Sequence, residues 1–372
     1  MKKIIWIVVI VLVIGVIWKV SKNDNAGPST GGPIKIAALL PLSGDAAAWG
    51  QNAERAIQLA TEKINNEGGV NDRQVEIIYE DTGGDPKKAV SSYQKVTSID
   101  KVTAVVGPLG QTEVMAVLPI IIKTKTPTII PSYVPLKNRP NLSNPLLVWM
   151  DAEEESSRIA EHVYGEGIRN VGVIGTLDSW EQTISDAFTA KFESLGGNIT
   201  IKEIVQPSVS DMKLAVTKVL GTKPEAVFLG TYYQFINSAK VLSDQNFQGK
   251  LYSIEVDDYL AGESASWTNG LRFIAPDYYQ EDFVKIFQDK FAQAPGLPAG
   301  QSYDAVNILF SILKQSENRD DILAAIDEFT SYDGVSGKFE INADGRTSLP
   351  TALFEVESGK IKRLSYLPLT QN

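Results

Sequence analysis

The sequence contains no cysteine and a single histidine, and it lacks the motifs of common nucleotide-binding folds. Without cysteine the chain has no disulfide bonds, no thiolate metal site and no thiol nucleophile. Neither GxxxxGKS, GxxxxGKT nor GxGxxG occurs, which removes the support for ATP or dinucleotide binding. His162 has no GxSxG elbow to accompany it, so a Ser-His-Asp site has no support either. We therefore predict no catalytic residue, no metal and no cofactor.

Positive charge is also scarce. The chain has 35 Lys and Arg against 45 Asp and Glu, which gives a formal net charge of -10. Because binding to phosphates needs a basic surface, we predict that nucleic acid is not a partner. The 372 residues are 43% hydrophobic, enough for a substantial core, and this length favours two domains over one.

The N-terminus carries an apolar run with lysines at both ends. Two lysines precede Ile4 to Trp18, and Lys19 follows. We interpret residues 1–20 as a transmembrane anchor or a signal segment, and the absence of a small-x-small cleavage site directly after it favours an uncleaved anchor. Positive-inside orientation then places the rest of the chain outside the cell, attached to the membrane. Residues 21–33 are rich in Gly, Pro, Ser and Asn and are predicted to form a flexible linker.

From Ile34 onward, strand patterns alternate with helix patterns. Ile34 to Leu40 is an apolar run of strand length, and the amphipathic helix pattern that follows it stops at Gly68-Gly69. The alternation continues to Met150, and a second series ends with the strand Leu251 to Ile254. Strands that alternate with helices imply parallel sheets with right-handed crossovers. The sequence therefore predicts an α/β fold with two doubly wound parallel-sheet domains.

The last hundred residues are expected to complete both domains. Leu271 to Ala275 is predicted to return to the first domain, which the helices Gln280 to Ala292 and Ser302 to Gln315 complete. Phe339 to Ile341 and a hairpin from Ala352 to Leu364 are expected to close onto the second domain.

Polar and aromatic residues follow the predicted strand ends in both domains. Ligands of open α/β sheets sit outside the carboxyl ends of the strands, so these residues are candidates for a binding site. Gln111 and Thr112 begin a helix, whose free N–H groups and positive end favour a carboxylate. The other candidates are Trp49, Ser132, Tyr133, Trp180, Tyr232 and Glu255. One aromatic residue in a loop usually only packs, but five strand ends that contribute such groups indicate a site.

Several motifs give the chain a family resemblance. They are a strand ending in Pro41-Leu42-Ser43-Gly44, the Trp49-Gly50 pair, an Ala-rich helix ending in Ile64-Asn65 before Gly68-Gly69, and a strand ending at Asp81 before Asp85-Pro86. With these motifs the chain resembles the leucine/isoleucine/valine-binding proteins of ABC importers, from about Ile34 to Leu364. The resemblance implies a type I periplasmic-binding fold with two lobes joined by three crossing strands. We expect lobe 1 to comprise residues 34–150 and 271–338, and lobe 2 to comprise residues 151–270 and 339–372.

The resemblance also implies a function. It predicts an extracytoplasmic solute-binding protein, not an enzyme, whose lobes close like a hinge on a small polar solute. That solute is expected to be a branched-chain or other amino acid, or a related amide or organic acid. The implied partners are this small molecule, the ABC permease subunits that recognise the closed form, and the membrane that holds the N-terminal segment.

For lobe 1 the resemblance assigns roles to three groups of residues. Trp49 corresponds to the aromatic residue of the first loop, and Gln111 and Thr112 correspond to the serine pair that caps the ligand carboxylate. Ser132 to Val134 corresponds to the segment that supplies a carbonyl and a threonine. The chain departs from the family pattern at several of these positions: glutamine replaces a serine, Val134 replaces the threonine, and a bulky tyrosine stands where the family has a small residue.

For lobe 2 the resemblance implies that Trp180 and Tyr232 match two tyrosine positions, and that Glu255 is the acid that pairs with the ligand's ammonium group. Two alternatives stay open. The chain could be a receptor lobe that reports the ligand to a signalling partner, or a hydrolase that uses two carboxylates, Glu255 with Asp257 or Asp258. A two-carboxylate mechanism needs a defined separation of about 5 to 9 Å, which the sequence does not give.

Overall fold

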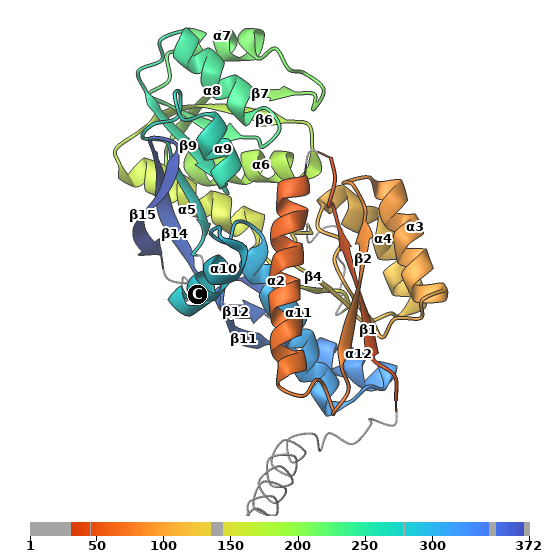
Figure 1. Cartoon of the computed structure of the whole chain (residues 1–372). Coiled ribbons are helices and arrows are strands. Elements are labelled where there is room, and N and C mark those ends of the chain that lie inside the picture. Colours follow the sequence, from red (N-terminus) through yellow and green to blue (C-terminus); the bar gives the residue numbers. More distant parts are fainter. Residues whose placement is uncertain (1–30, 45, 135–143, 278–279, 342–346, 368–372) are drawn as a thin grey trace, which may run out of the picture.

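The computed structural model describes residues 31–44, 46–134, 144–277, 280–341 and 347–367. They form two α/β lobes, one built from the first third of the chain and the other from the middle third with the C-terminal hairpin (Figure 1). The expected anchor and most of the linker lie outside the described residues. Among the helices that are described, none is both long and apolar enough to cross a membrane.

The first lobe contains a five-stranded parallel sheet with the order β2-β1-β3-β4-β5. Its strands are β1 (Ile34–Leu40), β2 (Val75–Asp81), β3 (Ala104–Val106), β4 (Thr128–Ile130) and β5 (Leu146–Leu147). Successive side chains of a strand point to opposite faces, and β1 is buried on both. Ile36 and Ala38 pack into one apolar cluster, whereas Ala37 and Leu39 pack into another.

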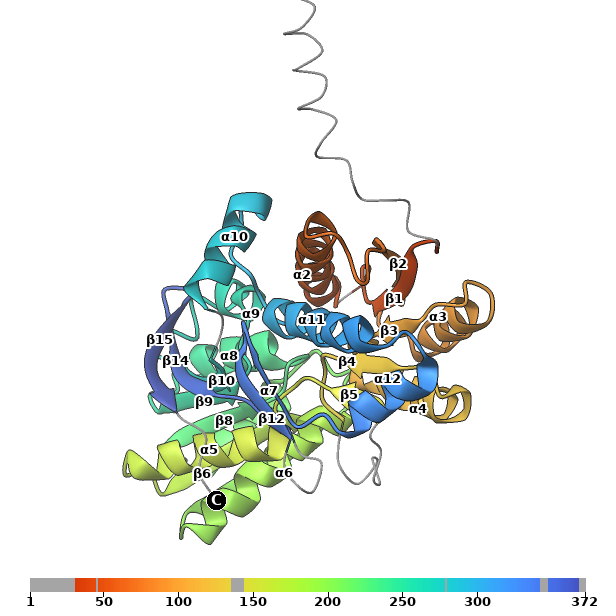
Figure 2. The same cartoon turned by 90° about the horizontal axis from the view of Figure 1, so that it is seen from below.

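Helices cover both faces of this sheet, as Figure 2 shows. The cluster around Ala37 and Leu39 is completed by α3 (Pro86–Ser98) and α4 (Gln111–Thr124), which contact each other. The cluster around Ile36 is completed by α2 (Ala47–Asn66), α11 (Ala299–Gln315) and α12 (Arg319–Asp327). As predicted, the late helices α10 (Glu281–Phe291) and α11 pack against α2. The first lobe is thus completed by a segment that lies about 200 residues further along the chain.

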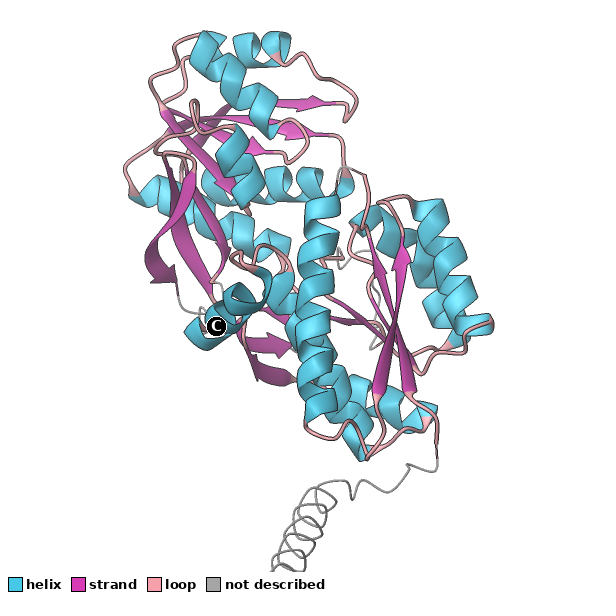
Figure 3. Cartoon of the chain, viewed as in Figure 1, coloured by secondary structure: helices cyan, strands magenta, loops and turns pink. Residues whose placement is uncertain are grey.

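The second lobe contains a seven-stranded sheet with the order β15-β14-β10-β9-β8-β6-β7. Five of its strands are parallel: β6 (Asn170–Thr176), β7 (Asn198–Val205), β8 (Ala226–Gly230), β9 (Lys250–Ile254) and β10 (Arg272–Pro276). The strands β14 (Thr351–Glu357) and β15 (Lys360–Leu367) form an antiparallel hairpin at one edge. Figure 3 shows how strands and helices alternate through both lobes.

Two groups of helices sandwich this sheet. The helices α5 (Ala152–Gly165) and α6 (Ser179–Ser194) contribute to the cluster on one face, where Phe188 stacks on Phe228 of the sheet. The helices α7 (Lys213–Gly221), α8 (Phe235–Asp244) and α9 (Asp258–Glu263) contribute to the cluster on the other face. Both domains are therefore doubly wound, as the alternating pattern predicted.

Strand β10 lies in the second lobe, which corrects the expectation that Leu271 to Ala275 returns to the first. It pairs with β9 in parallel and with β14 in antiparallel register. The reason is packing: Phe273 is fully buried in the cluster under α7 to α9 and stacks on Phe354 of β14. The expected boundary at residue 270 is thus too early for this strand.

A small third sheet accompanies the two large ones. It has the order β11-β12-β13, with β11 (Ser331–Gly334), β12 (Gly337–Ile341) and β13 (Thr347–Ser348). Phe339 of β12 packs into the cluster that also contains α5 and α6, so the segment meets the second lobe without joining its sheet. The predicted C-terminal hairpin is confirmed, because Glu357 and Lys360 pair on either side of the Ser358-Gly359 turn.

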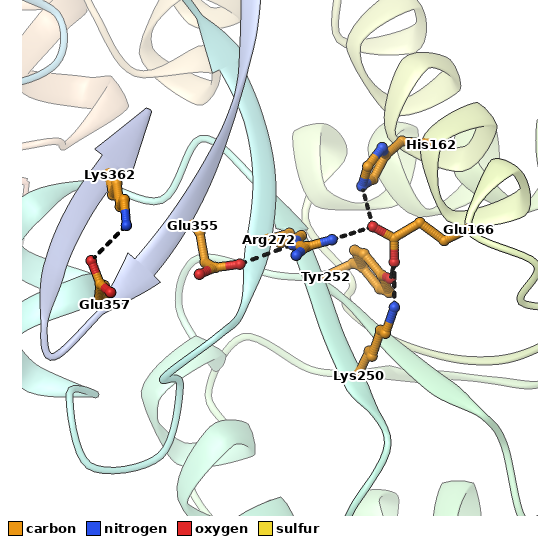
Figure 4. Close-up of polar contacts among 8 residues, drawn as sticks. All are labelled: His162, Glu166, Lys250, Tyr252, Arg272, Glu355, Glu357 and Lys362. Carbon is orange, nitrogen blue, oxygen red and sulfur yellow. Dashed lines mark hydrogen bonds and ion pairs between the residues drawn. The ribbon is translucent and has the colours of Figure 1, made fainter. Parts of the chain in front are cut away.

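A carboxylate at the end of α5 ties this helix to the strands beneath it (Figure 4). Glu166 pairs with Lys250 at 2.5 Å and with Arg272, and it accepts a hydrogen bond of 2.7 Å from the Tyr252 hydroxyl. His162, one turn earlier, lies 2.9 Å from the same carboxylate. Burial alone would raise the pKa of Glu166, but hydrogen bonds from Lys250 and Tyr252 bring it down to about 2. His162 thus contributes to a structural cluster.

We expect Glu166→Gln to lower the free energy of unfolding by about 1 kcal/mol at pH 7, since solvent reaches part of this cluster and weakens its charge pairs. The folded-state pKa near 2 lies below the ordinary value of 4.5. The parent's greater free energy of unfolding, relative to Glu166→Gln, is therefore complete above about pH 5 and is lost as the pH falls towards 2. Urea denaturation of parent and variant at pH 7 and pH 3 measures this change.

The matched control is Glu193→Gln on the exposed side of α6. Its effect on stability should be small at both pH values. A penalty for Glu166→Gln that is equally large at pH 3 and pH 7 would contradict the assignment of Glu166 as the ionised centre of the cluster.

Candidate functional site

The loop after β1 is fixed by one carboxylate from the neighbouring strand. Asp81, the last residue of β2, accepts hydrogen bonds from the Ser43 hydroxyl at 2.6 Å and from the backbone N–H groups of Leu42 and Ser43 at 2.9 and 3.1 Å. The N–H of Gly83 donates to the same carboxylate at 2.9 Å. The hydrogen bond from Ser43 is the main cause that holds the pKa of Asp81 below its ordinary value. The entry to α2 therefore has a defined conformation.

Gly50 brings the start of α2 against this loop. A Cβ atom at Gly50 would lie 2.1 Å from the carbonyl oxygen of Pro41, so a larger residue would push the helix away from the strand end. This contact explains why a glycine follows Trp49 in the sequence. The glycine allows the close approach, and the tryptophan beside it extends towards the second lobe.

Trp49 joins the two lobes. Its indole Nε1 donates a hydrogen bond of 3.2 Å to Oδ2 of Asp257, which lies beyond strand β9 in the second lobe. The Tyr232 hydroxyl donates to the same oxygen at 3.0 Å, and the Tyr232 ring stands edge-on to Trp49 at 6.3 Å. The other Asp257 oxygen accepts the N–H of Leu260 and so caps α9. Two predicted site residues from different lobes thus converge on one carboxylate.

A second tryptophan lies behind the first. The Trp149 ring is 5.8 Å from the Trp49 ring, and its Nε1 donates a hydrogen bond of 2.9 Å to Oε1 of Glu255. Trp149 and Glu255 are each only 2% exposed. Glu255 has a φ of 48°, in the left-handed region that non-glycine residues rarely adopt, and its N–H donates to the carbonyl of Ile274. The backbone therefore turns sharply where β9 ends, and the carboxylate is placed inside the molecule.

Glu155 lies beside Glu255 and is fully buried. Among the described residues, no group donates a hydrogen bond to either of its carboxyl oxygens. Glu155 and Glu255 can form a hydrogen bond with each other only when one of the two carboxyls is protonated. Burial and the nearby charge of Glu255 raise the pKa of Glu155 well above its ordinary value, and burial raises the pKa of Glu255 to about 7. The pair is thus poised to gain or lose a proton near neutral pH.

The Tyr232 loop is held by another buried acid. Glu181 on α6 is fully buried, and its Oε1 accepts the backbone N–H groups of Tyr232 at 2.6 Å and Tyr233 at 3.1 Å. Its neighbour Trp180 is half-buried and packs against the same apolar cluster as Trp49. This helix start therefore both orients Tyr232 and adds an aromatic side chain to the region between the lobes.

The N-terminus of α4 already holds a carboxylate of the chain itself. Glu113 is fully buried, and its Oε2 accepts the Gly110 N–H at 2.8 Å in a capping box. The Gln111 side-chain amide is shielded from solvent, and it has no hydrogen-bond partner among the described residues. Thr112 is exposed. Of the two predicted carboxylate-capping side chains, only Gln111 is directed inward.

The segment after β4 divides between two clusters. Tyr133 is 5% exposed and packs in the cluster that contains Trp149. Val134 is buried in the core of the first lobe under α4, and Ser132 is buried just before them. The structure thus brings Trp49, Tyr133, Trp180, Tyr232 and Glu255 to one region. It does not bring the side chains of Thr112 and Val134 there.

Sequence reasoning missed two members of this region and underused a third. Trp149 ends an apolar run that reads as an ordinary strand, and Glu155 stands in an acidic helix start that reads as solvated. The signal for Trp149 was its place directly after a strand end, the rule that selected Trp49. The sequence suggests Asp257 only as a partner of Glu255 in a hydrolase, whereas in the structure Asp257 accepts hydrogen bonds from residues of both lobes.

The comparison with protein families decides the identity of the chain. The sequence model of the periplasmic binding protein family matches residues 33–360, most of the chain. This chain belongs to the periplasmic binding protein family. Membership confirms the resemblance drawn from the motifs, and it implies an extracytoplasmic protein that binds small solutes.

Several known proteins are similar to this periplasmic binding protein. The Leu/Ile/Val-binding protein BraC3 of Rhizobium johnstonii is 23% identical over 350 residues, which cover 88% of this chain and 93% of the relative. The branched-chain amino acid transporter substrate binding protein LivJ of Streptococcus pneumoniae, in complex with isoleucine, aligns with a TM-score of 0.84 and 20% identity, covering 91% and 100%. A solute binding protein of an R. palustris ABC transporter, in complex with benzoate, aligns with a TM-score of 0.78 and 18% identity, covering 91% and 97%. These structures confirm the type I fold.

The buried pair of carboxyls generates a prediction about pH. Because the pKa of Glu255 is near 7 in the folded protein and 4.5 ordinarily, the folded state binds more protons between these values, so stability falls as the pH rises through this window. Glu255→Gln removes the carboxyl that titrates, so the variant does not lose stability in this way. Its amide oxygen can still accept the hydrogen bond from Trp149. We expect the stability of the variant relative to the parent to rise by about 1 to 3 kcal/mol between pH 5 and pH 8.

Chemical denaturation without added ligand, at both pH values, measures this difference. The control is Glu263→Gln on the exposed side of the neighbouring helix α9, whose difference from the parent should stay constant. If the relative stability of Glu255→Gln is the same at pH 5 and pH 8, the carboxyl of Glu255 does not titrate near neutral pH.

Proposed function

We propose that this periplasmic binding protein is the solute-binding component of an ABC importer, and that its lobes close on a small polar solute such as an amino acid or a related amine, amide or organic acid. The observation that carries the proposal is the contact of Trp49 with Asp257 and Tyr232. This contact joins strand-end loops of two lobes, where ligands of such sheets bind. A solute that binds better between closed lobes than between open ones shifts the population to the closed form.

The proposed site uses the residues that follow the strand ends. Trp49, Trp180 and Tyr232 would enclose the body of the solute, and Glu255 would accept hydrogen bonds from its ammonium group. Gln111 and Thr112, with the backbone N–H groups of their helix, would meet an anionic or polar end. Ser132, Tyr133 and Val134 would contribute backbone groups and packing next to them.

The proposed partners follow from this role. Permease subunits in the membrane would recognise the closed form, and the N-terminal segment would keep the protein at the outer side of the same membrane. A ligand-sensing receptor would use the same closure, so it differs only in the protein that reads the closed form. The hydrolase with Glu255 and Asp257 has less support, because both oxygens of Asp257 already accept hydrogen bonds from the protein.

Replacement of Trp49 tests the site. Trp49→Phe keeps an aromatic ring but removes the N–H that reaches Asp257, a hydrogen bond to a charged group worth about 1.5 kcal/mol or more. We expect the closed form to be less stable and the affinity for solute to fall about tenfold or more. The solute is the one that native mass spectrometry detects with the purified protein, and calorimetry measures its affinity.

The matched control is Trp267→Phe, since Trp267 packs against the cluster under α7 to α9, on the other face of the second lobe's sheet. Its affinity should equal that of the parent. The proposed function fails if no solute copurifies and if no amino acid, amine, amide or aromatic acid raises the melting temperature of the parent protein.

A further inference from the structure

Two buried carboxyls lie next to the interlobe contact, and the one cation that acts on Glu155 from nearby, Arg158, forms its described hydrogen bonds with other groups. Glu155 is fully buried and Glu255 is 2% exposed. The indole of Trp149 donates to Glu255, but no described group donates to Glu155. Arg158, on the next turn of α5, directs its guanidinium to the Thr351 hydroxyl at 2.7 Å and to Glu154. The carboxyl pair is therefore left with one donor from the described protein for four oxygens.

Such a pair is costly in a folded protein. Neighbouring carboxylates repel each other, and a buried acceptor without a donor loses its hydration without compensation. In a binding site such a cost can serve a function, because a ligand can supply the missing donors and add positive charge to that of Arg158. Asp257 differs, since both of its oxygens accept hydrogen bonds from the protein. Glu181 differs in part, since backbone N–H groups reach one of its oxygens while the other has no partner among the described residues.

We propose that the interlobe site takes an organic cation whose nitrogen donates hydrogen bonds to both Glu155 and Glu255. This assignment rests on the proposed solute-binding function and names the chemical class of the solute. Primary ammonium, amidinium and guanidinium groups can donate in two directions, whereas a quaternary ammonium group cannot. Trp49, Trp149 and Tyr232 lie along the path from Asp257 to this pair, and their rings attract cations as well as apolar groups.

The start of α4, where the family resemblance puts the carboxylate of a ligand, disfavours a carboxylate on the solute. The Glu113 carboxyl already occupies the N-terminal turn of α4, the place where the family resemblance put a ligand carboxylate. Thr112 is exposed, and valine stands at position 134 in place of a hydroxyl. A zwitterionic amino acid would thus bring a negative group next to a buried acid and find fewer donors there. The amine without the carboxylate is the better match.

Matched pairs of probes test this class directly. 3-Methylbutylamine and leucine differ by the carboxylate alone, as do agmatine and arginine. Calorimetry on the parent protein at pH 8 should give at least tenfold higher affinity for one amine than for the corresponding amino acid. That amine should bind more weakly at pH 5, because Glu155 and Glu255 then hold protons that the cation must displace; Glu154 and Arg158 on α5 also face this pair.

Substitutions on α5 test whether Glu155 is the second carboxyl that contacts the amine. Glu155→Gln should reduce the affinity for the amine at least tenfold, whereas Glu153→Gln, on the exposed side of the same helix, should leave it unchanged. Circular dichroism melting shows whether each variant folds. If Glu155→Gln does not fold, the comparison of amine with amino acid on the parent, and Glu255→Gln, still decide the question.

The results separate this proposal from the proposed function. If leucine, arginine or benzoate binds as tightly as the amines, or if Glu155→Gln binds the amine like the parent, the cation assignment is wrong while solute binding stands. Equal binding of choline would also overturn it, since choline has no N–H to donate. If no probe binds and no solute copurifies, the proposed function fails together with the cation assignment.

Discussion

The hydrogen bond from Trp49 to Asp257 joins loops of the two lobes. The geometry of this hydrogen bond is set by three loops that carboxylates hold in place. Asp81 holds the loop before α2, Glu181 holds the loop that carries Tyr232, and Asp257 is itself held as the cap of α9. In each case a carboxylate accepts backbone N–H groups, so the acids that give the chain its negative charge also serve as its loop anchors.

Local patterns were sufficient for individual elements of the fold. The strand β1 and the helix α2 could be predicted because the spacing of their apolar residues is visible within one continuous stretch of sequence. The same stretch contains the Gly68-Gly69 pair that ends the helix pattern. The lobe to which β10 belongs was not predictable in this way. Its apolar residues suit any buried strand. Only the pairing with β9, about 20 positions earlier, and with β14, about 80 positions later, decides its place.

The same limit applies to the site. The sequence could predict that Trp49, Tyr232 and Glu255 lie near one another, because the carboxyl ends of parallel strands meet at one edge. Their role in binding stays a prediction. Trp149 and Glu155 were not found, since a tryptophan in an apolar run and a glutamate in a helix's first turn have ordinary local explanations. Their significance comes from burial, which depends on the packing of α5 against β9 and β10.

The burial of acids near the interlobe contact has two different physical outcomes. Where backbone N–H groups converge on a carboxylate oxygen, as at Glu181, these hydrogen bonds stabilise the acid and hold the loop. Where two carboxyls meet with a single described donor, as at Glu155 and Glu255, further compensation must come from a proton or from a bound cation. A protein that closes around its solute can use this difference. The acids bound by backbone N–H groups hold the loops of the site, and the pair with fewer donors favours closure when a ligand adds donors and positive charge.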